Sequence, residues 1–443
     1  MTVPDEVRDP GLWSRSAACI EAALALIRKH QEGHPIPTKL RVKVRREDRT
    51  TTHFDHEVQP DISLLVFRLF DALKQLPEFQ ALHGYILSSP VAGSVFVDAG
   101  NNPIREAGSQ SHWLMNFYIV PLLTRYIGSQ LTLDFDEGRA KAVYARLEDF
   151  LRSTRITYSI VAPLEHFEGP DDEVRLDATT LLRKLSEDEI QYLWDLGEFG
   201  GIVDRNQALG MGFCLATYQV AKKNAPTNFS QVNARLARLV TALRLLKSGQ
   251  VGIPAVIQSP REPVFGPVYG GASSGPTPAL LGPTYTLLLE DRERLIATYE
   301  ALGSGAAVQE FRVALERFNY AYERKRPHDK LIDYWVALEA LFLPDISQEL
   351  SFRASLRIAY YVAGTPDERE EVFRKMRLSY DTRSDVVHGQ RLKADVSEVA
   401  SDTEEIVRRA LRAVVTNPGS LDVDRLDAAI ARGESPAQEG AVK

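Results

Sequence analysis

Two residues near the C-terminus combine side chains that could act on a phosphate group. Arg383 and His388 stand five residues apart in the stretch SYDTRSDVVHGQRL, residues 379–392. Arginine keeps its charge at any ordinary pH, and its planar guanidinium suits phosphate oxygens. Histidine exchanges protons near neutral pH, so it can serve as an acid or a base. The pair could therefore support proton transfer beside a bound phosphate.

A helix predicted over 366–388 carries both residues. Apolar side chains at helical spacing form one stripe along it, and Arg383 fills the missing place in that stripe. Gly389 is the residue type that ends helices in the left-handed conformation, which puts His388 in the last turn. The negative end of a helix favours a protonated histidine. The stripe residues are Phe373, Met376, Tyr380 and Val387.

Two carboxylates are candidates to support this pair. Glu339 interrupts the apolar inward face of LIDYWVALEALFLP, and we expect it to pair with Arg383, because a buried unpaired arginine costs about 3 to 5 kcal/mol. Asp385 precedes His388 by three residues and could hold one ring nitrogen. The alternatives are an ion pair that only fixes helix register, and a histidine that only caps the helix or lies on its surface.

Spacing alone does not bring Arg383 and His388 together. Residues five apart on an ideal helix diverge by roughly 140°. Convergence requires the long arginine side chain to swing around, the helix end to loosen, or a second subunit to supply its own copy of the pair. We favour the last arrangement, in which a cleft on a two-fold axis holds two pairs and one RNA strand.

The elements that position these residues fall into an α+β chain. A mixed α/β region is followed by helices, with a Gly/Pro-rich connection between them. The helices are expected at 287–302, 305–326, 328–343, 348–363, 366–388 and 396–415. The predicted divisions are 1–260, which could hold two subdomains near 1–150 and 151–260, then the connection 261–285, a helical domain 286–416 and a polar, frayed tail 417–443.

Several local patterns define the first region. Helical periodicity covers 14–31 and 62–76, KLRVKVRRED and RITYSIVAPLEHF alternate like strands, and the apolar segment 112–127 is interrupted at Pro121. Ser186 and Glu189 fit a helix capping box. This mixture of periods is what indicates α and β structure together.

Composition limits the classes of function. The chain has 443 residues and a net charge of −7, which argues against a protein that coats nucleic acid, so any RNA site must be a local patch. Cys19 and Cys214 lie in apolar surroundings without paired spacing, so neither a disulfide framework nor a cysteine zinc site is indicated. The start lacks a signal-peptide pattern and no apolar stretch is long enough to span a membrane. We expect a cytoplasmic protein with no membrane partner.

RSDVVH, Arg383 through His388, matches the R-x4-6-H motif of HEPN domains, and its setting resembles the Apea-like branch. Three segments in order carry this resemblance: residues 314–344, 349–364 and 378–392, which cover about the last third of the chain. Members are helical bundles that dimerise, and many are metal-independent endoribonucleases of toxin–antitoxin and anti-phage defence systems. Others are inactive binding modules, so a non-catalytic dimerisation and ligand- or RNA-binding module is the alternative function.

The resemblance implies a set of roles. Arg383 and His388 would be catalytic, Ser384 would fill the variable polar position of the motif, and RNA would be the substrate of a homodimer without cofactor or metal. The first two thirds of the chain would respond to a trigger ligand or protein. Asp385, Glu339 and Tyr380 are the supporting residues, and the candidates for further RNA contacts are Arg353, Arg357 and Arg391.

Other patterns carry weaker interpretations. Ser384 and His388 could meet as a Ser–His hydrolase pair, but no G-x-S-x-G turn or leading strand is present. HFDHE, 53–57, is more typical of a polar surface than of a metal site, and GGASSG lacks the Gly-Lys-Ser/Thr ending of a phosphate loop. The ERKRPH run, 323–328, is interpreted first as a solvated turn and second as an RNA contact.

Overall fold

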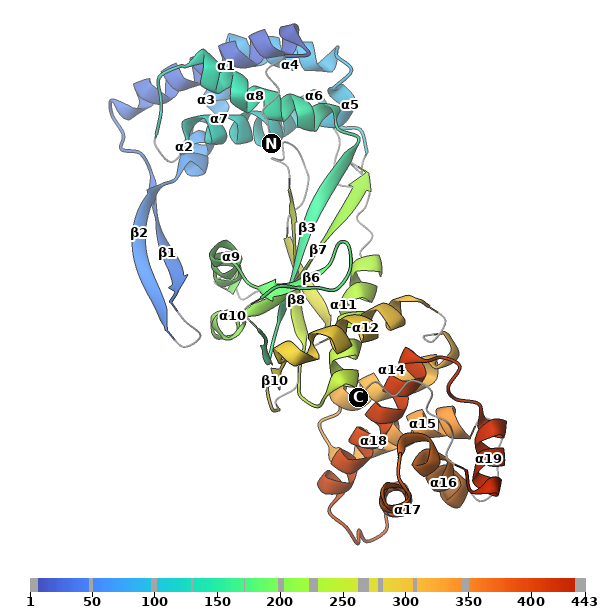
Figure 1. Cartoon of the computed structure of the whole chain (residues 1–443). Coiled ribbons are helices and arrows are strands. Elements are labelled where there is room, and N and C mark those ends of the chain that lie inside the picture. Colours follow the sequence, from blue (N-terminus) through green and yellow to red (C-terminus); the bar gives the residue numbers. More distant parts are fainter. Residues whose placement is uncertain are drawn as a thin grey trace.

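The computed structural model has three parts arranged along one long axis: a layer of helices, a central sheet and a helical bundle (Figure 1). The fold is mixed α+β, as predicted. The structure describes residues 7–47, 51–96, 102–128, 131–170, 172–197, 203–222, 230–261, 271–277, 282–305, 309–343 and 350–434.

The N-terminal layer is built from helices. The helix predicted over 14–31 is confirmed, whereas the one predicted over 62–76 is divided at Leu69 into two shorter helices. Pro121 does not end a helix. A five-residue π-helical turn, Met115–Ile119, lies just before it, and an α-helix continues through it. The change of helix type accommodates the missing N–H of proline. The helices are α1 (Pro10–Gln31), α2 (Ile62–Arg68), α3 (Phe70–Lys74), α4 (Pro77–Leu87), α5 (Ala92–Val95), α6 (Ala107–Leu114), α7 (Val120–Ile127) and α8 (Glu137–Arg152).

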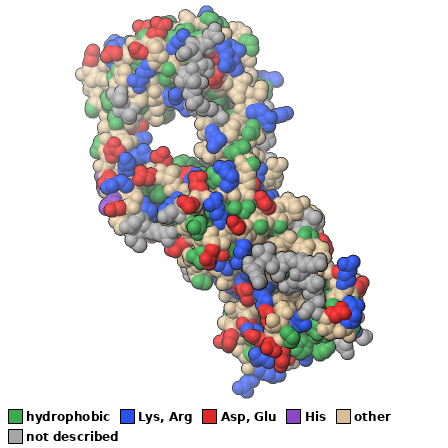
Figure 2. All heavy atoms as spheres, viewed as in Figure 1, with side chains coloured by type: hydrophobic (Ala, Val, Ile, Leu, Met, Phe, Trp, Pro, Cys, Tyr) green, Lys and Arg blue, Asp and Glu red, His purple; other side chains and the backbone are tan. Residues whose placement is uncertain are grey.

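A β-hairpin leaves this layer and reaches the next part of the molecule. It pairs β1 (Thr38–Arg46) with β2 (Thr52–Pro60), and one of its faces carries Val44 and Phe54 side by side. Those two side chains pack against helix α9 (Glu187–Gly197), where Phe54 lies 4.9 Å from the ring of Trp194. Figure 2 shows an opening enclosed by the hairpin, the helical layer and the central sheet.

The central sheet has the strand order β5-β6-β7-β3-β8-β9 and every neighbouring pair is antiparallel. It begins soon after α8 ends at Arg152, close to the predicted subdivision near 150. The predicted Gly/Pro-rich connection, 261–285, contains strand β9 and directly follows strand β8, so it is not simply a loop; 262–270 and 278–281 are outside the described residues. The strands are β3 (Arg155–Leu164), β5 (Val174–Arg175), β6 (Leu181–Lys184), β7 (Phe213–Lys222), β8 (Ile253–Pro260) and β9 (Gly271–Thr277), while β4 (Phe167–Glu168) pairs with β10 (Tyr285–Thr286).

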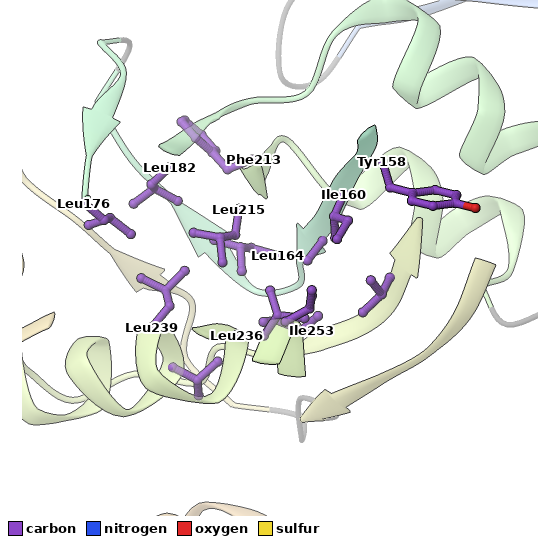
Figure 3. Packing of buried hydrophobic residues seen from close by; sticks show 14 of the residues in the cluster. Tyr158, Ile160, Leu164, Leu176, Leu182, Phe213, Leu215, Leu236, Leu239 and Ile253 are labelled. Atoms are coloured by element: carbon purple, nitrogen blue, oxygen red, sulfur yellow. The ribbon is translucent and has the colours of Figure 1, made fainter. Parts of the chain in front are cut away.

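Both faces of the sheet are covered by helices. On one face, Ile160, Phe213 and Leu215 pack against α11 (Ser230–Leu246), as Figure 3 shows. On the other face, Val161 and Cys214 pack against α9 and α10 (Arg205–Gly210). The alternation follows from the two-residue period of strands. The predicted capping box starts α9, because the backbone N–H groups of Ser186 and Glu189 each donate to the other's side chain.

The C-terminal bundle follows the predicted helices closely. The prediction of a frayed tail is wrong for Val423–Arg432, which form helix α19 and pack on α16 through Leu426 and Ala429. Residues 435–443 lie outside the described residues. The helices are α12 (Arg292–Gly303), α14 (Arg312–Glu323), α15 (Pro327–Phe342), α16 (Leu350–Val362), α17 (Pro366–Val387) and α18 (Val396–Thr416), preceded by a 3-10 turn, Leu289–Asp291.

Two further properties concern the whole described chain. Within the described ranges, every helix is too short or too polar to cross a lipid bilayer. Cys19 and Cys214 are buried free thiols, one in the helical layer and one in the sheet, as their apolar surroundings indicated. Burial raises the pKa of each thiol to about 12.

Candidate functional site

Arg383 lies at the edge of the buried face of α17, with 24% of its side chain exposed. Its Nη2 atom is 3.7 Å from Oε1 of Glu339 on α15, so the structure brings these two predicted partners together at a distance too long for a hydrogen bond. The Tyr380 ring centroid lies 6.0 Å from the Arg383 guanidinium carbon. The Nε atom of Arg383 is buried and has no hydrogen-bond partner among the described residues.

A buried polar chain fixes the position of the helices around Arg383. Trp335 on α15 donates from Nε1 to the Ser379 hydroxyl of α17 at 2.8 Å, and Ser379 in turn shares a 2.6 Å hydrogen bond with Thr403 of α18. The edge of Trp335 also meets the Tyr380 ring at 5.0 Å. These contacts hold three helices in register beside Arg383. Ser379 and Thr403 carry no sequence signal that separates them from surface residues.

His388 stands at the end of α17, where its side chain is exposed. Gly389 has φ +65°, and it and Gln390 donate to the carbonyls of Val386 and Asp385 at 3.3 Å and 2.8 Å. This pair of hydrogen bonds is a Schellman motif, which confirms the predicted left-handed end of the helix. The imidazole therefore projects from a fixed helix terminus into solvent.

The structure does not bring the other predicted partners to His388. Asp385 is buried whereas His388 is exposed, and among the described residues no hydrogen bond or ion pair joins the Asp385 carboxylate to the imidazole. Ser384 contributes its backbone carbonyl, which accepts the His388 N–H at 3.0 Å. Within one chain, no hydrogen bond in the described part connects Arg383 with His388, as their angular separation on the helix indicated.

The predicted apolar stripe of α17 is correct for Met376 and wrong for Val387. Met376 is fully buried, whereas Val387 is 50% exposed although its neighbour Val386 packs against the core. Leu392, four residues after His388, is also exposed. The helix end that presents the imidazole thus presents apolar side chains as well.

The three further candidates for RNA contact divide into two kinds. Arg353 and Arg391 are exposed. Arg357 is buried, which corrects its assignment: it donates two hydrogen bonds to Asp427 of α19, at 2.8 Å and 2.6 Å, and one to the Phe342 carbonyl at 2.6 Å. Its role is to bind α15, α16 and α19 together.

A surface depression that the sequence did not predict lies between the start of α15 and the first half of α18. Its volume is about 270 Å³, and part of its rim is the ERKRPH run. Its chemistry comes from residues far apart in sequence, which a linear pattern does not connect. The lining residues are Lys325, Pro327, Lys330, Ser397, Ala400, Ser401 and Glu404.

The HFDHE segment lies on the exposed strand β2, where His53 pairs with Glu47 at 2.7 Å. Across the described residues, histidine, cysteine and acidic side chains form no group of three that could hold a metal ion.

Comparisons with family models, with curated proteins and with solved structures found no match for this chain. The functional assignment therefore depends on the residues and their geometry.

Proposed function

We propose that the chain is a metal-independent endoribonuclease of HEPN type that acts as a homodimer. The observation that carries this proposal is the state of Arg383. Its side chain is partly exposed and, among the described residues, pairs with one carboxylate, Glu339, at 3.7 Å, which leaves donors on the terminal nitrogens for an RNA phosphate. An exposed imidazole, His388, ends the same helix.

The reaction uses the nucleophile that RNA carries. The 2′-hydroxyl attacks the adjacent phosphorus, the bond from phosphorus to the 5′-oxygen breaks, and the products are a 2′,3′-cyclic phosphate and a free 5′-hydroxyl. One His388 accepts the proton of the 2′-hydroxyl, and its copy in the second subunit donates a proton to the leaving oxygen. Arg383 neutralises the charge that develops on the non-bridging oxygens.

Exposed apolar side chains support pairing through this end of α17. Val387 and Leu392 flank His388, and Leu378 is exposed further along the same helix. Covering them with the same surface of a second copy would remove apolar area from water and bring two helix ends to one axis. A dimer of this kind supplies the second Arg383–His388 pair that one chain cannot.

The remaining parts would restrain or trigger the nuclease, as expected of a toxin or an anti-phage defence effector. Helix α11 covers the central sheet and also packs on α12 and α18 of the bundle. A ligand or protein that binds the N-terminal parts would therefore act on the helices around Arg383 through the contacts of α11.

Cleavage of single-stranded RNA by purified protein in EDTA tests the proposal. Wild type should cleave it and leave 2′,3′-cyclic phosphate ends, whereas Arg383→Ala and His388→Ala should reduce the rate by at least about 10²-fold. Asp381→Ala, an exposed change on the same helix, is the matched control and should retain activity. Cleavage that survives in both Arg383→Ala and His388→Ala would refute the assignment.

The alternative is a non-catalytic module that dimerises and binds RNA or another ligand. One observation favours it: Asp385 does not hold the His388 imidazole, so nothing in the described chain fixes that ring's orientation. If wild type and His388→Ala are equally harmless in cells and equally inert on RNA, with or without a trigger, the binding module is supported.

A further inference from the structure

The depression between α15 and α18 is separate from the proposed catalytic pair. Its described lining includes neither Arg383 nor His388, nor the two residues that interact with the Arg383 side chain, Glu339 and Tyr380. Its volume, about 270 Å³, is larger than a single ion needs and suits a small organic molecule. Its lining combines two lysines, two serines and one glutamate.

The rim of the depression is positively charged. Lys325 and Lys330 form no ion pair with any described residue, although Asp333 nearby is bound by Arg317 and Arg324 at 3.0 Å and 2.8 Å. The depression also lies where two long helices begin, because Pro327 is the first residue of α15 and Ser397 the second of α18. The start of α18 is already capped by a carboxylate, because Asp395 accepts a hydrogen bond from the backbone N–H of Ser397 at 2.8 Å, so the positive charge at the depression comes from the two lysines. A phosphate dianion matches two lysines and two serine hydroxyls better than a single carboxylate does.

One lining residue of the depression is a carboxylate that already has partners within the protein. Glu404 accepts hydrogen bonds from Tyr322 and Tyr334, each at 2.8 Å, and pairs with the buried guanidinium of Arg408. Its side chain remains 18% exposed, so lone pairs on its oxygens can still accept. Glu404 thus already has a cationic partner, Arg408, which it shares with Glu405. A neutral donor such as a sugar hydroxyl is the matching group.

We propose that this depression binds a phosphorylated sugar, such as the ribose phosphate of a nucleotide. The phosphate meets Lys325, Lys330 and the hydroxyls of Ser397 and Ser401, and a sugar hydroxyl donates to Glu404. This site would exist whether or not the chain cleaves RNA.

Calorimetric titration of the full chain with ribose 5-phosphate, inorganic phosphate and ribose tests the site. Ribose 5-phosphate should bind at least about tenfold more tightly than either fragment, since each fragment lacks one half of the contacts. Lys330→Gln should weaken ribose 5-phosphate by about tenfold or more, and Ser401→Leu, which fills the depression, should abolish binding. Arg383→Ala with His388→Ala should leave binding unchanged, so failure of the nuclease proposal and of this site are distinguishable.

Lys393→Gln is the matched control, because Lys393 is exposed near the start of α18 but does not line the depression. Equal weakening by Lys330→Gln and Lys393→Gln would show general electrostatic attraction and overturn the site. Two results would overturn the ligand class: ribose 5-phosphate binding no more tightly than phosphate, or a free amino acid binding more tightly than either. Absence of any binding at about 1 mM would overturn the proposal entirely. Glu404→Gln is avoided because it also disturbs buried Arg408.

Discussion

Arg408 on α18 donates a hydrogen bond from Nε to the backbone carbonyl of Arg244 on α11, at 2.8 Å. Both side chains are almost completely buried. Arg408 also bonds to Tyr322 and pairs with Glu404 and Glu405, while the Arg244 guanidinium lies 4.5 Å from the Tyr322 ring centroid. The junction between the sheet and the C-terminal bundle is therefore a buried charged network, in which each ion depends on its neighbours.

Loss of one member of that network should be costly. Arg408→Met leaves Glu404 without its cation and the Arg244 carbonyl without its donor, so the free energy of unfolding should fall by about 3 to 5 kcal/mol. Urea denaturation followed by circular dichroism measures it. Arg425→Met removes an arginine whose side chain is 88% exposed, and that control should change stability by less than about 0.5 kcal/mol. Equal effects would mean that the network contributes nothing.

The contact between Arg357 and Asp427 should give stability a defined pH dependence. The Arg357 guanidinium, which donates two hydrogen bonds to Asp427, holds the pKa of that carboxyl below its usual range. The stabilisation is therefore complete above the ordinary aspartate pKa of about 3.9 and is lost as the pH falls through the lower folded value. Because 48% of the Asp427 side chain is exposed, solvent screens the pair, so Asp427→Asn should cost about 0.5 to 1 kcal/mol at pH 6, and less at pH 3. If the loss of unfolding free energy caused by Asp427→Asn grew as the pH fell, this explanation would be wrong.

Two glycines should respond to alanine in opposite directions. Gly389 has the left-handed φ of +65° at the end of α17. There is space for a methyl group at this position, but alanine disfavours this backbone conformation, so Gly389→Ala should destabilise the chain by about 1 to 2 kcal/mol. Gly84 lies exposed within α4 with open space around it, so Gly84→Ala should stabilise by about 0.5 to 1 kcal/mol. Thermal unfolding of both variants tests the prediction. A loss of stability in Gly84→Ala would show that the argument from backbone freedom is wrong.

The helices of the bundle could be predicted because their apolar residues recur with the helical period and their ends carry clear signals. Ser186 and Glu189 bond to each other, and Gly389 bonds to the helix end directly before it, so these signals act within a few residues and can be recognised in the sequence. Strand β9 was missed because its residues, GASSGPT, have neither apolar alternation nor bulky side chains. It is held by pairing with β8, a contact that sequence pattern does not encode.

The candidate site was predictable only in part, for the same reason. Glu339 and Arg383 are residues of opposite charge, and each interrupts the apolar face of its helix. This common feature predicts that they pair with each other. Arg357 and Arg408 look like members of solvated faces, yet α19 and α11 cover them. Whether a charge is buried depends on which distant helix packs on it. The same limit hid the depression at Glu404, whose walls come from two separate helices.

The hairpin between the N-terminal layer and the sheet makes the upper half of the molecule a closed frame. Near its far end, Arg46 donates to the carbonyls of Met211 and Leu209, and the backbone N–H of Val44 donates to Gln191 at 2.7 Å. A frame joined at two places cannot hinge at one of them alone. Rotation of the helical layer against the sheet requires that these hairpin contacts break first, because the chain between α8 and β3 alone would not prevent it. A partner that separates the hairpin from the sheet would therefore allow this rotation.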